Sequence, residues 1–320
     1  MHATSREYRG AEDDDLLRSF LLDARAGGNL AGWHPGDLVW RFFLHSLRHD
    51  LGETVRLWLD SRGRLRAFAI VTPRSRAGNL LFDGQAHPQA GGRALWDEML
   101  SWIESLAGVA HPPPRVIATD VGVYDADEAQ AAALGARGYR PTGDEALLLA
   151  RSLQAPIPPP ALPAGFRLRP VAGLQEAARR AEAHRDAFHP SRITAAAYER
   201  LMSTPGYDAQ WDLVAEAPDG CLAAFCLVWL DAANGSGEFE PVGTRRAFRR
   251  LGLARAVLLE GLRRLAEAGA QTALVGPIDA GDDIALALYR SAGFRPAHHL
   301  RACARVWGAP GGPQGQARPS

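Results

Sequence analysis

Apolar residues recur along the chain at two different spacings. In Val55–Val71 and again in Trp211–Leu230, two short runs rich in Val, Leu, Ala, Phe and Trp flank a turn that contains glycine, and this pattern predicts a β-hairpin in each segment. In Ala94–Ala107 and Leu253–Ala268 the apolar residues are instead three or four positions apart, which predicts two amphipathic helices. A glycine follows each helix, as is common where helices end.

The same order of elements occurs twice. Each half opens with a short predicted strand, at Glu7–Arg9 and Phe166–Pro170, and continues with helical segments, the hairpin, a glycine-bearing loop and the amphipathic helix. A β-rich segment and a last helix follow, ending in the similar sequences ARGYRP and SAGFRP, whose glycines Gly138 and Gly293 are 155 residues apart. We therefore predict an α+β fold of two tandem domains, each a mixed, mostly antiparallel sheet flanked by helices.

A proline-rich segment separates the two halves. The sequence QAPIPPPALPAG at 154–165 cannot continue a helix or a central strand, so it predicts an extended linker. We expect an N-terminal domain at 1–153 and a C-terminal domain at 166–306. The Gly- and Pro-rich end of the chain, 307–320, predicts a disordered tail.

Composition restricts the function further. The 320 residues carry 36 basic and 36 acidic side chains, and this balance is not that of a general nucleic-acid or anionic-membrane binder. The longest apolar run is about half of a membrane span, so we expect a cytoplasmic protein without membrane or nucleic-acid partners. The ten histidines lack the spacing of a metal site, and none is expected. The oligomeric state stays open.

The segment from Gly237 to Leu265 carries the most specific signal. It predicts a strand at Glu238–Thr244, a basic loop at Arg245–Leu251 and a helix that begins after Gly252. The first N–H groups of a helix have no partner within it and carry partial positive charge, which suits a phosphate group. Gly252 leaves room for such a ligand, although a solvated basic turn between a strand and a helix would give the same pattern.

The run Arg249-Arg250-Leu251-Gly252-Leu253-Ala254 resembles the (Gln/Arg)-x-x-Gly-x-(Gly/Ala) signature of the GNAT acetyltransferase superfamily. The resemblance extends over 166–305, and the two-copy layout is similar to that of tandem GNAT proteins of the mycothiol synthase type. It implies that backbone amides of this run hold the pyrophosphate of acetyl-CoA, the co-substrate. It also implies that the preceding strand, with Val242 and Thr244, holds the rest of the donor. Asp282, where relatives often have Asn, completes the expected cofactor-binding residues.

Three side chains are candidates for acid–base chemistry. Tyr289 precedes the terminal Gly-Phe by four residues, a position where GNAT relatives often carry a tyrosine near the sulfur of CoA, and a phenol there could protonate the departing thiolate. It could equally be a helix residue packed on the sheet. Glu238 and Glu240 alternate with an apolar residue and share one face of the strand, so either could accept the amine proton, or both could be structural.

The first copy lacks the complete signature. The repeat aligns Arg249 with Pro88, Ala254 with Arg93 and Tyr289 with Leu134. We therefore expect the C-terminal domain to move an acetyl group from acetyl-CoA to a primary amine, with a small molecule as acceptor, and the first copy to catalyse no transfer. A non-catalytic acyl-CoA-binding or regulatory module and a protein or peptide N-acetyltransferase are the alternatives.

Overall fold

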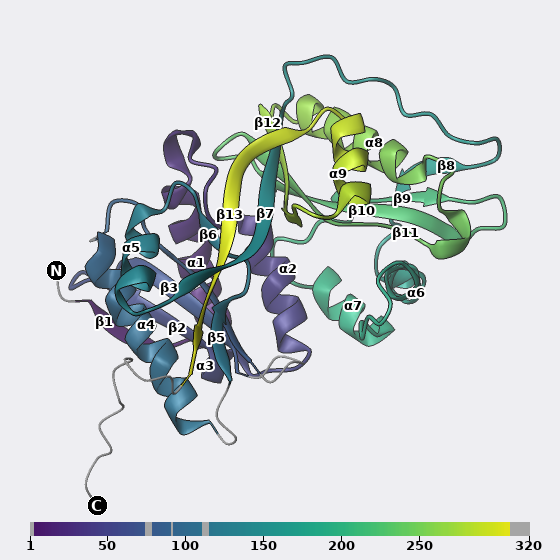
Figure 1. Cartoon of the computed structure of the whole chain (residues 1–320). Helices are drawn as coiled ribbons and strands as arrows, with labels where there is room; N and C mark the ends of the chain where they lie inside the picture. Colours follow the sequence, from purple (N-terminus) through teal and green to yellow (C-terminus); the bar gives the residue numbers. More distant parts are fainter. Residues whose placement is uncertain (1–2, 74–78, 91, 111–114, 308–320) are drawn as a thin grey trace, which may run out of the picture.

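A computed structural model describes residues 3–73, 79–90, 92–110 and 115–307 (Figure 1). The first half contains β1 (Thr4–Glu7), α1 (Ala11–Ala24), α2 (Pro35–Ser46), α3 (Leu51–Thr54), β2 (Val55–Leu59), β3 (Leu65–Thr72), β4 (Leu80–Ala86), α4 (Gly92–Val109), β5 (Val116–Thr119), β6 (Val123–Tyr124), α5 (Glu128–Ala136) and β7 (Arg140–Ser152). The second half contains β8 (Arg167–Pro170), α6 (Ala177–Ala187), α7 (Ala195–Met202), β9 (Asp212–Glu216), β10 (Leu222–Asp231), β11 (Ser236–Thr244), α8 (Leu253–Glu267), β12 (Thr272–Asp279), α9 (Asp283–Ser291) and β13 (Arg295–Val306). None of these helices combines the length and the apolar composition of a membrane span.

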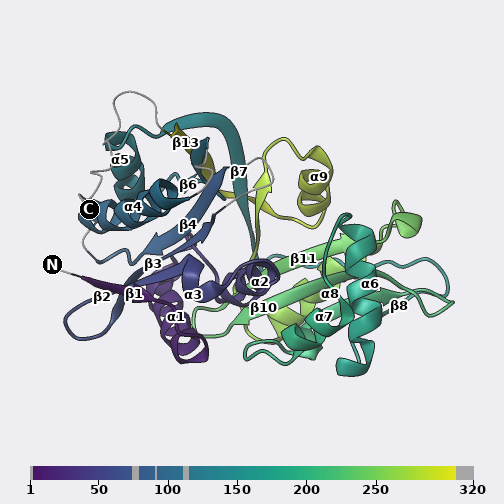
Figure 2. The same ribbon diagram turned by 90° about the horizontal axis from the view of Figure 1, so that it is seen from below.

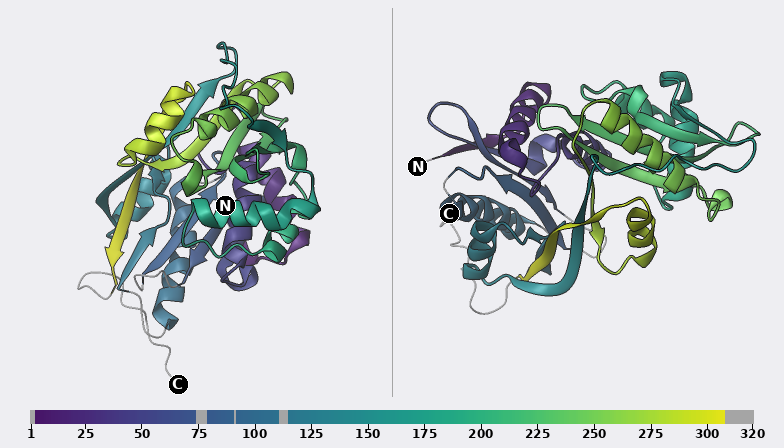
Figure 3. Two further views of the ribbon diagram at one scale, coloured as in Figure 1. Left: turned by 90° about the vertical axis from the view of Figure 1, so that its right-hand side faces the viewer. Right: turned by 90° about the horizontal axis from the view of Figure 1, so that it is seen from above.

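The predicted internal repeat and the α+β class are confirmed. In each half, helices that precede the hairpin cover one face of the sheet, and the helix that follows the next strand (α4 after β4, α8 after β11) covers the other face (Figure 3). The apolar stripe of α8 explains this placement, because its leucines pack with Phe239 and with residues of β9 to β12 in one core. The corresponding stripe of α4 forms a second core with β3, β4 and β5. The predicted tail beyond Trp307 lies outside the described residues.

The two halves exchange their last strands. The described strands form one sheet in the order β1-β2-β3-β4-β5-β13-β7-β12-β11-β10-β9-β8, with β6 paired to β13. The long strands β7 and β13 run antiparallel to each other between the halves (Figure 1), so β7 of the first half reaches β12 and β13 of the second half reaches β5. The halves are therefore held together by strand pairing as well as by the proline-rich linker. Its role as a domain boundary stays a prediction.

Helix α2 of the first half packs against the second half (Figure 2). Its apolar residues Val39, Trp40 and Phe43 share a core with Trp229 of β10 and with α6 and α7. A Cβ at Gly36 would stand 2.3 Å from the ring of Trp229, so only glycine permits this close approach. The polar face of α2 is thereby held over the neighbouring strand, β11.

Strands β11 and β12 pair over a short distance and then part. Their parallel pairing joins Ser236, Gly237 and Glu238 to residues of β12, and it ends at Leu274. Beyond that point β11 stays paired with β10, whereas β12 follows β7. The sheet is therefore open between the two strands from Phe239 onward, and this opening positions the site described next.

Candidate active site

A cavity of about 950 Å³ lies at the opening between β11 and β12. Both halves of the chain line it. The second half contributes Glu240 and Val242 from β11 and Tyr289 from α9, and the first half contributes Asp37 and Arg41 from α2. The six residues of the predicted loop, Arg249 to Ala254, are not among those that line the cavity.

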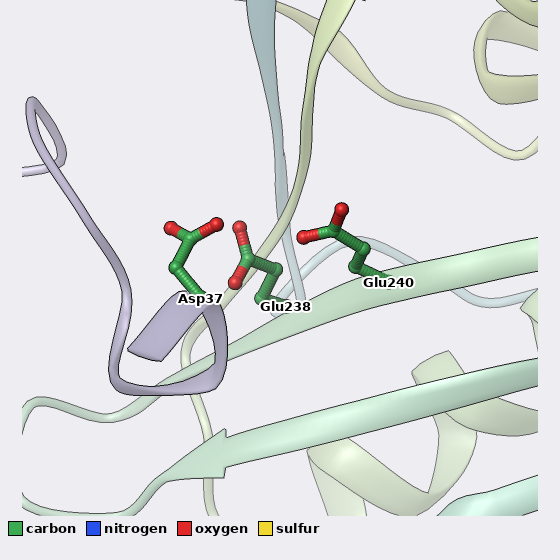
Figure 4. Close-up of side chains that lie close together, drawn as sticks. All are labelled: Asp37, Glu238 and Glu240. Atoms are coloured by element: carbon green, nitrogen blue, oxygen red, sulfur yellow. The ribbon is translucent and has the colours of Figure 1, made fainter. Parts of the chain in front are cut away.

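Three carboxyl groups lie close together beside this cavity (Figure 4). One oxygen of each of Asp37, Glu238 and Glu240 lies within 4.8 Å of an oxygen of the other two, and we call these three residues the carboxyl cluster. Glu238 and Glu240 share one face of β11, as the sequence predicts, while Phe239 between them packs towards α8. Asp37 and Glu240 line the cavity, but Glu238 lies behind them with 2% of its surface exposed.

Burial and mutual repulsion keep protons on this cluster. Burial, followed by the negative charge of Asp37, raises the pKa of Glu240 to about 8. Burial likewise raises the pKa values of Asp37 and Glu238, although the positive charge of Arg41 opposes both shifts. The carboxyl oxygens of Asp37 and Glu240 lie within 4.8 Å of each other, and a hydrogen bond between them needs one of the two groups to be protonated. The raised pKa values of both groups favour a pair that shares one proton and carries a single negative charge.

These pKa values predict a stability that falls with rising pH. A carboxyl group whose pKa is higher in the folded chain stabilises the fold fully below its unfolded pKa, near 4.5, and loses that contribution as the pH rises through its folded pKa, about 8 for Glu240. Buried histidines such as His45 and His184, whose pKa values are lowered, add stability as the pH rises to about 6.5, so we expect the Tm from calorimetry to fall between pH 6.5 and pH 8. In the Glu240→Gln variant, whose amide does not ionise, the decline is expected to be shallower. Equal slopes in the two proteins would contradict the raised pKa.

Tyr289 of α9 also lines the cavity. It is 7% exposed and its ring packs edge-on against Phe294, the phenylalanine of the sequence SAGFRP. Burial, followed by the negative charge of Glu240, raises the pKa of Tyr289 above its ordinary value of 10. The phenol therefore carries its proton at neutral pH and is available as a donor towards the cavity.

The predicted loop presents a free helix N-terminus. Gly252 adopts a left-handed conformation with φ of +76° and precedes the first turn of α8. The N–H of Ala256 donates to the carbonyl of Gly252, so the N–H groups of Leu253, Ala254 and Arg255 precede the first bond of the helix. A Cβ at Gly252 would meet no atom within 4 Å, which means that the space in front of this N-terminus is open.

Some polar groups around the loop have hydrogen-bond partners within the described chain and others do not. The hydroxyl of Thr244, at the end of β11, is buried and has no hydrogen-bond partner in the part of the chain that the structure describes. Arg250 and Leu251 are exposed, and Arg249 is exposed while donating to the carbonyl of Ala187. Asp282 is also exposed, and its side chain caps α9 by accepting from the N–H of Ala285. A contact between Asp282 and a cofactor stays a prediction.

Sequence reasoning missed the contribution of α2. Arg41 bonds Asp83 at 2.7 Å, lies 3.7 Å from Asp120 and stacks over Trp33 with 4.0 Å to the ring centroid. Burial lowers the pKa of Arg41, but the neighbouring carboxylates raise it by more. The guanidinium therefore stays charged beside the carboxyl cluster. Asp37 and Arg41 are about 200 positions from β11 in the sequence, and no local pattern connects them to it.

Comparison with known proteins identifies the family. The model of the acetyltransferase (GNAT) family matches residues 179–294. The mycothiol acetyltransferase of Kineococcus radiotolerans is 32% identical over 256 residues, which cover 78% of this chain and 80% of that protein. The chain belongs to the GNAT acetyltransferase family. It is therefore an acyltransferase, as the resemblance in the sequence implies.

Solved structures place this GNAT acetyltransferase among tandem proteins. A GCN5-related N-acetyltransferase from Sphaerobacter thermophilus superposes with a TM-score of 0.61 at 25% identity, and the match covers 95% of each chain. A tandem GNAT protein from the clavulanic acid biosynthesis pathway superposes with a TM-score of 0.64 at 16% identity, covering 95% of this chain and 98% of that one. The match to the tandem protein over nearly its whole length confirms the predicted tandem fold.

The first copy of this GNAT acetyltransferase also opens between two parallel strands. β4 and β5 pair from Leu80 to Phe82, and a pocket of about 390 Å³ lies beyond the point where they part. The described residues that line it include Asp83, Asp127 and Glu128 but neither arginine nor lysine. Leu134, which the repeat aligns with Tyr289, is buried in the core. The absence of acetyl transfer at this copy stays a prediction, which the acidic lining supports.

Proposed function

We propose that the chain transfers the acetyl group of acetyl-CoA to a primary amine of a small molecule, at the cavity between its two halves. The observation that carries the proposal is the presence of Glu240 and Tyr289 in one cavity, at the point where β11 and β12 part. The first is a carboxyl group whose pKa lies near neutrality and the second a protonated phenol. A base and an acid that face the same space are what amide formation from a thioester needs.

The coenzyme would be held by the start of α8. Its pyrophosphate is dianionic, and the free N–H groups after Gly252 offer both hydrogen bonds and partial positive charge. The hydroxyl of Thr244, which has no partner in the described chain, would donate a hydrogen bond to the pantetheine arm or accept one from it. We assign Val242, on the same face of β11 and lining the cavity, a backbone contact with the acetyl carbonyl.

Glu240 would prepare the acceptor. Its carboxylate takes a proton from the bound ammonium group, and the neutral nitrogen then bonds to the acetyl carbon. The carbon–sulfur bond breaks, the sulfur takes the proton of Tyr289, and the second proton lost by the nitrogen restores the phenol through solvent. Acetyl-CoA supplies the activated acyl group, while the chain's residues orient the reactants and move protons.

The acceptor is proposed to be a small molecule because the first half covers the site. α2 places Asp37 and Arg41 over β11, so the amine enters a cavity with walls from both halves. The relative from Kineococcus radiotolerans is named a mycothiol acetyltransferase, and mycothiol is a small molecule. A protein or peptide acceptor would require an open groove at the same place.

The experiment mixes the purified chain with acetyl-CoA and a panel of small primary amines and follows release of free thiol. Turnover with at least one amine is expected. If the chain binds acetyl-CoA but releases no thiol beyond its hydrolysis rate across the panel, the alternative of a non-catalytic acyl-CoA-binding module is favoured. Turnover of peptides alone would replace the small acceptor by a protein or peptide.

The role of Tyr289 gives a separate prediction. Tyr289→Phe removes the proton donor and keeps the ring that packs on Phe294, so kcat is expected to fall about tenfold or more with little change in acetyl-CoA affinity. Steady-state kinetics and calorimetry measure the two quantities. Tyr139→Phe is the matched control, since this buried phenol of the first half does not line the cavity. An unchanged kcat would remove Tyr289 from the mechanism.

A further inference from the structure

His34, at the start of α2, is fixed as a neutral imidazole by its own helix. The side chain is 98% buried, and its Nδ1 accepts the N–H of Gly36 at 3.0 Å. A nitrogen that accepts an N–H carries no proton of its own, so the proton of the ring is on Nε2. Nε2 faces the hydroxyl of Ser236 at 3.4 Å. Burial, and then the charge of Arg25, lower the pKa of His34, in agreement with this tautomer.

Glu238 faces this same unprotonated nitrogen. Its Oε2 lies 3.4 Å from Nδ1 of His34, a distance at which a charged histidine would form an ion pair. Nδ1 offers only a lone pair, however, and Oε2 is buried without a hydrogen-bond partner in the described chain. A carboxylate oxygen and this lone pair repel each other, whereas a proton on Oε2 removes the repulsion and lets its O–H share the lone pair of Nδ1 with the N–H of Gly36.

The groups that surround Glu238 leave it the member of the carboxyl cluster best placed to stay neutral. Those that face it from the neighbouring elements are Arg25 at the end of α1, His34, Asp37 and Arg41 of α2, Tyr124 of β6, and Glu240 of β11. Arg25 opposes the rise in the pKa of Glu238, and its Nη1 has no hydrogen-bond partner in the described chain. Its charge is shared with the fully buried Asp231, 3.6 Å from its Nε, and its Nη2 donates to Ser236. The two other carboxyl groups of the cluster, Asp37 and Glu240, add negative charge, which disfavours a further carboxylate.

We propose that His34 is a positioning residue of the acetyl-transfer site, which keeps Glu238 as a neutral carboxylic acid so that only the Asp37–Glu240 pair exchanges a proton with the acceptor. The carboxyl cluster then holds two protons on three groups and has one negative charge. That charge matches one ammonium group, so the cluster takes a monocationic amine. The first copy thus controls the protonation of a group on the second. This inference rests on the proposed function for its role, although the charge state itself does not.

The charge state is tested without any acceptor. In the full chain labelled with [5-¹³C]glutamate, the carboxyl resonance of Glu238, assigned by its loss in Glu238→Gln, is expected to show a protonated group without titration from pH 5 to pH 8. Nitrogen-15 spectra of the histidines are expected to show His34 as the Nε2–H tautomer over the same range. A titration midpoint of Glu238 within this range, or a protonated Nδ1, would overturn the proposal.

The variant His34→Ala tests the cause, and His34→Asn is its control. Asparagine places Oδ1 where Nδ1 lies, so it still accepts the N–H of Gly36 and still presents a lone pair to Glu238. Alanine removes that acceptor and leaves the N–H of Gly36 free to donate to Glu238, which favours the carboxylate. The added charge should raise the midpoint of Glu240, and the acidic limb of kcat/KM for the best amine of the panel, by about one pH unit. The double variant His34→Ala/Glu238→Gln, in which position 238 cannot ionise, should return both midpoints to the wild-type values.

The two readouts distinguish the possible failures. A midpoint of Glu240 that does not move in His34→Ala, or that moves equally in His34→Asn, contradicts the proposal. A shift that persists in the double variant also contradicts it, because a merely structural effect of position 34 would not need Glu238. If the resonance of Glu240 shifts as expected but the pH profile of turnover does not, the charge state holds and the proposed base is wrong.

Discussion

Replacing Glu240 by glutamine is expected to lower kcat by about 10²- to 10⁴-fold, the range that a positioned general base contributes. The amide keeps the shape of the side chain and can still bond Asp37, but it accepts no proton from the ammonium group. Binding of acetyl-CoA, measured by calorimetry, should change little, because the start of α8 is not among the residues that line the cavity. The pH dependence of kcat should also lose the limb near pH 8 that Glu240 provides.

Glu145→Gln is the control for this experiment. Glu145 also lines the cavity, but its side chain is exposed and lies 3.7 Å from Arg301 rather than in the carboxyl cluster. Its replacement should leave kcat within about threefold, since exposed ion pairs contribute little. Equal losses in both variants would mean that general charge in the cavity, and not proton transfer at Glu240, determines the rate.

Gly252→Leu is expected to weaken the binding of CoA by about 100-fold or more. The glycine has φ of +76° and open space in front of it, so a leucine side chain would both strain the backbone and fill the place proposed for the pyrophosphate. Hydrogen bonds to a charged group are worth roughly 1.5–3 kcal/mol each, and the loss of two gives a change of this size. Calorimetric titration with CoA measures the affinity directly.

Gly269→Leu is the control that separates backbone strain from blocking of the proposed pyrophosphate site. Gly269 follows the other end of α8, has φ of +84° and likewise has no atom within 4 Å of an added Cβ. The two variants should therefore lose similar amounts of thermal stability, about 1–2 kcal/mol by the cost of the left-handed conformation. Only Gly252→Leu should lose CoA. Normal binding by Gly252→Leu would remove this N-terminus as the pyrophosphate site and with it the proposed function.

Much of the fold could be predicted because its signals are local. Hairpins at Val55–Val71 and Trp211–Leu230 follow from apolar runs around turn residues, and the structure has β2–β3 and β9–β10 there. The helix predicted at Leu253–Ala268 is observed at Leu253–Glu267, since apolar spacing and a terminal glycine fix such an element without reference to the rest of the chain. The strand predicted at Glu7–Arg9 is instead Thr4–Glu7, because a short edge strand has few residues to define its ends.

The candidate site was only partly accessible to the same reasoning. The GNAT signature and the alternation of Glu238 and Glu240 predicted a loop and a shared face, both of which the structure contains. The alternation alone does not distinguish the two glutamates. The structure separates them by exposure, with Glu240 in the cavity and Glu238 behind it, a difference that depends on what packs over β11 rather than on β11 itself.

By itself, the sequence determined the duplicated α+β plan, the strand–loop–helix segment around Gly252 and the family, since each depends on residues close together along the chain. The tertiary structure alone decided that β7 and β13 exchange between the halves and that α2 brings Asp37 and Arg41 to the second copy. The pairing of strands and the packing of helices that are far apart in the sequence produce no local sequence pattern. Any apolar strand, or any helix with an apolar face, could in principle complete either half. The charges that meet at the carboxyl cluster follow from that packing.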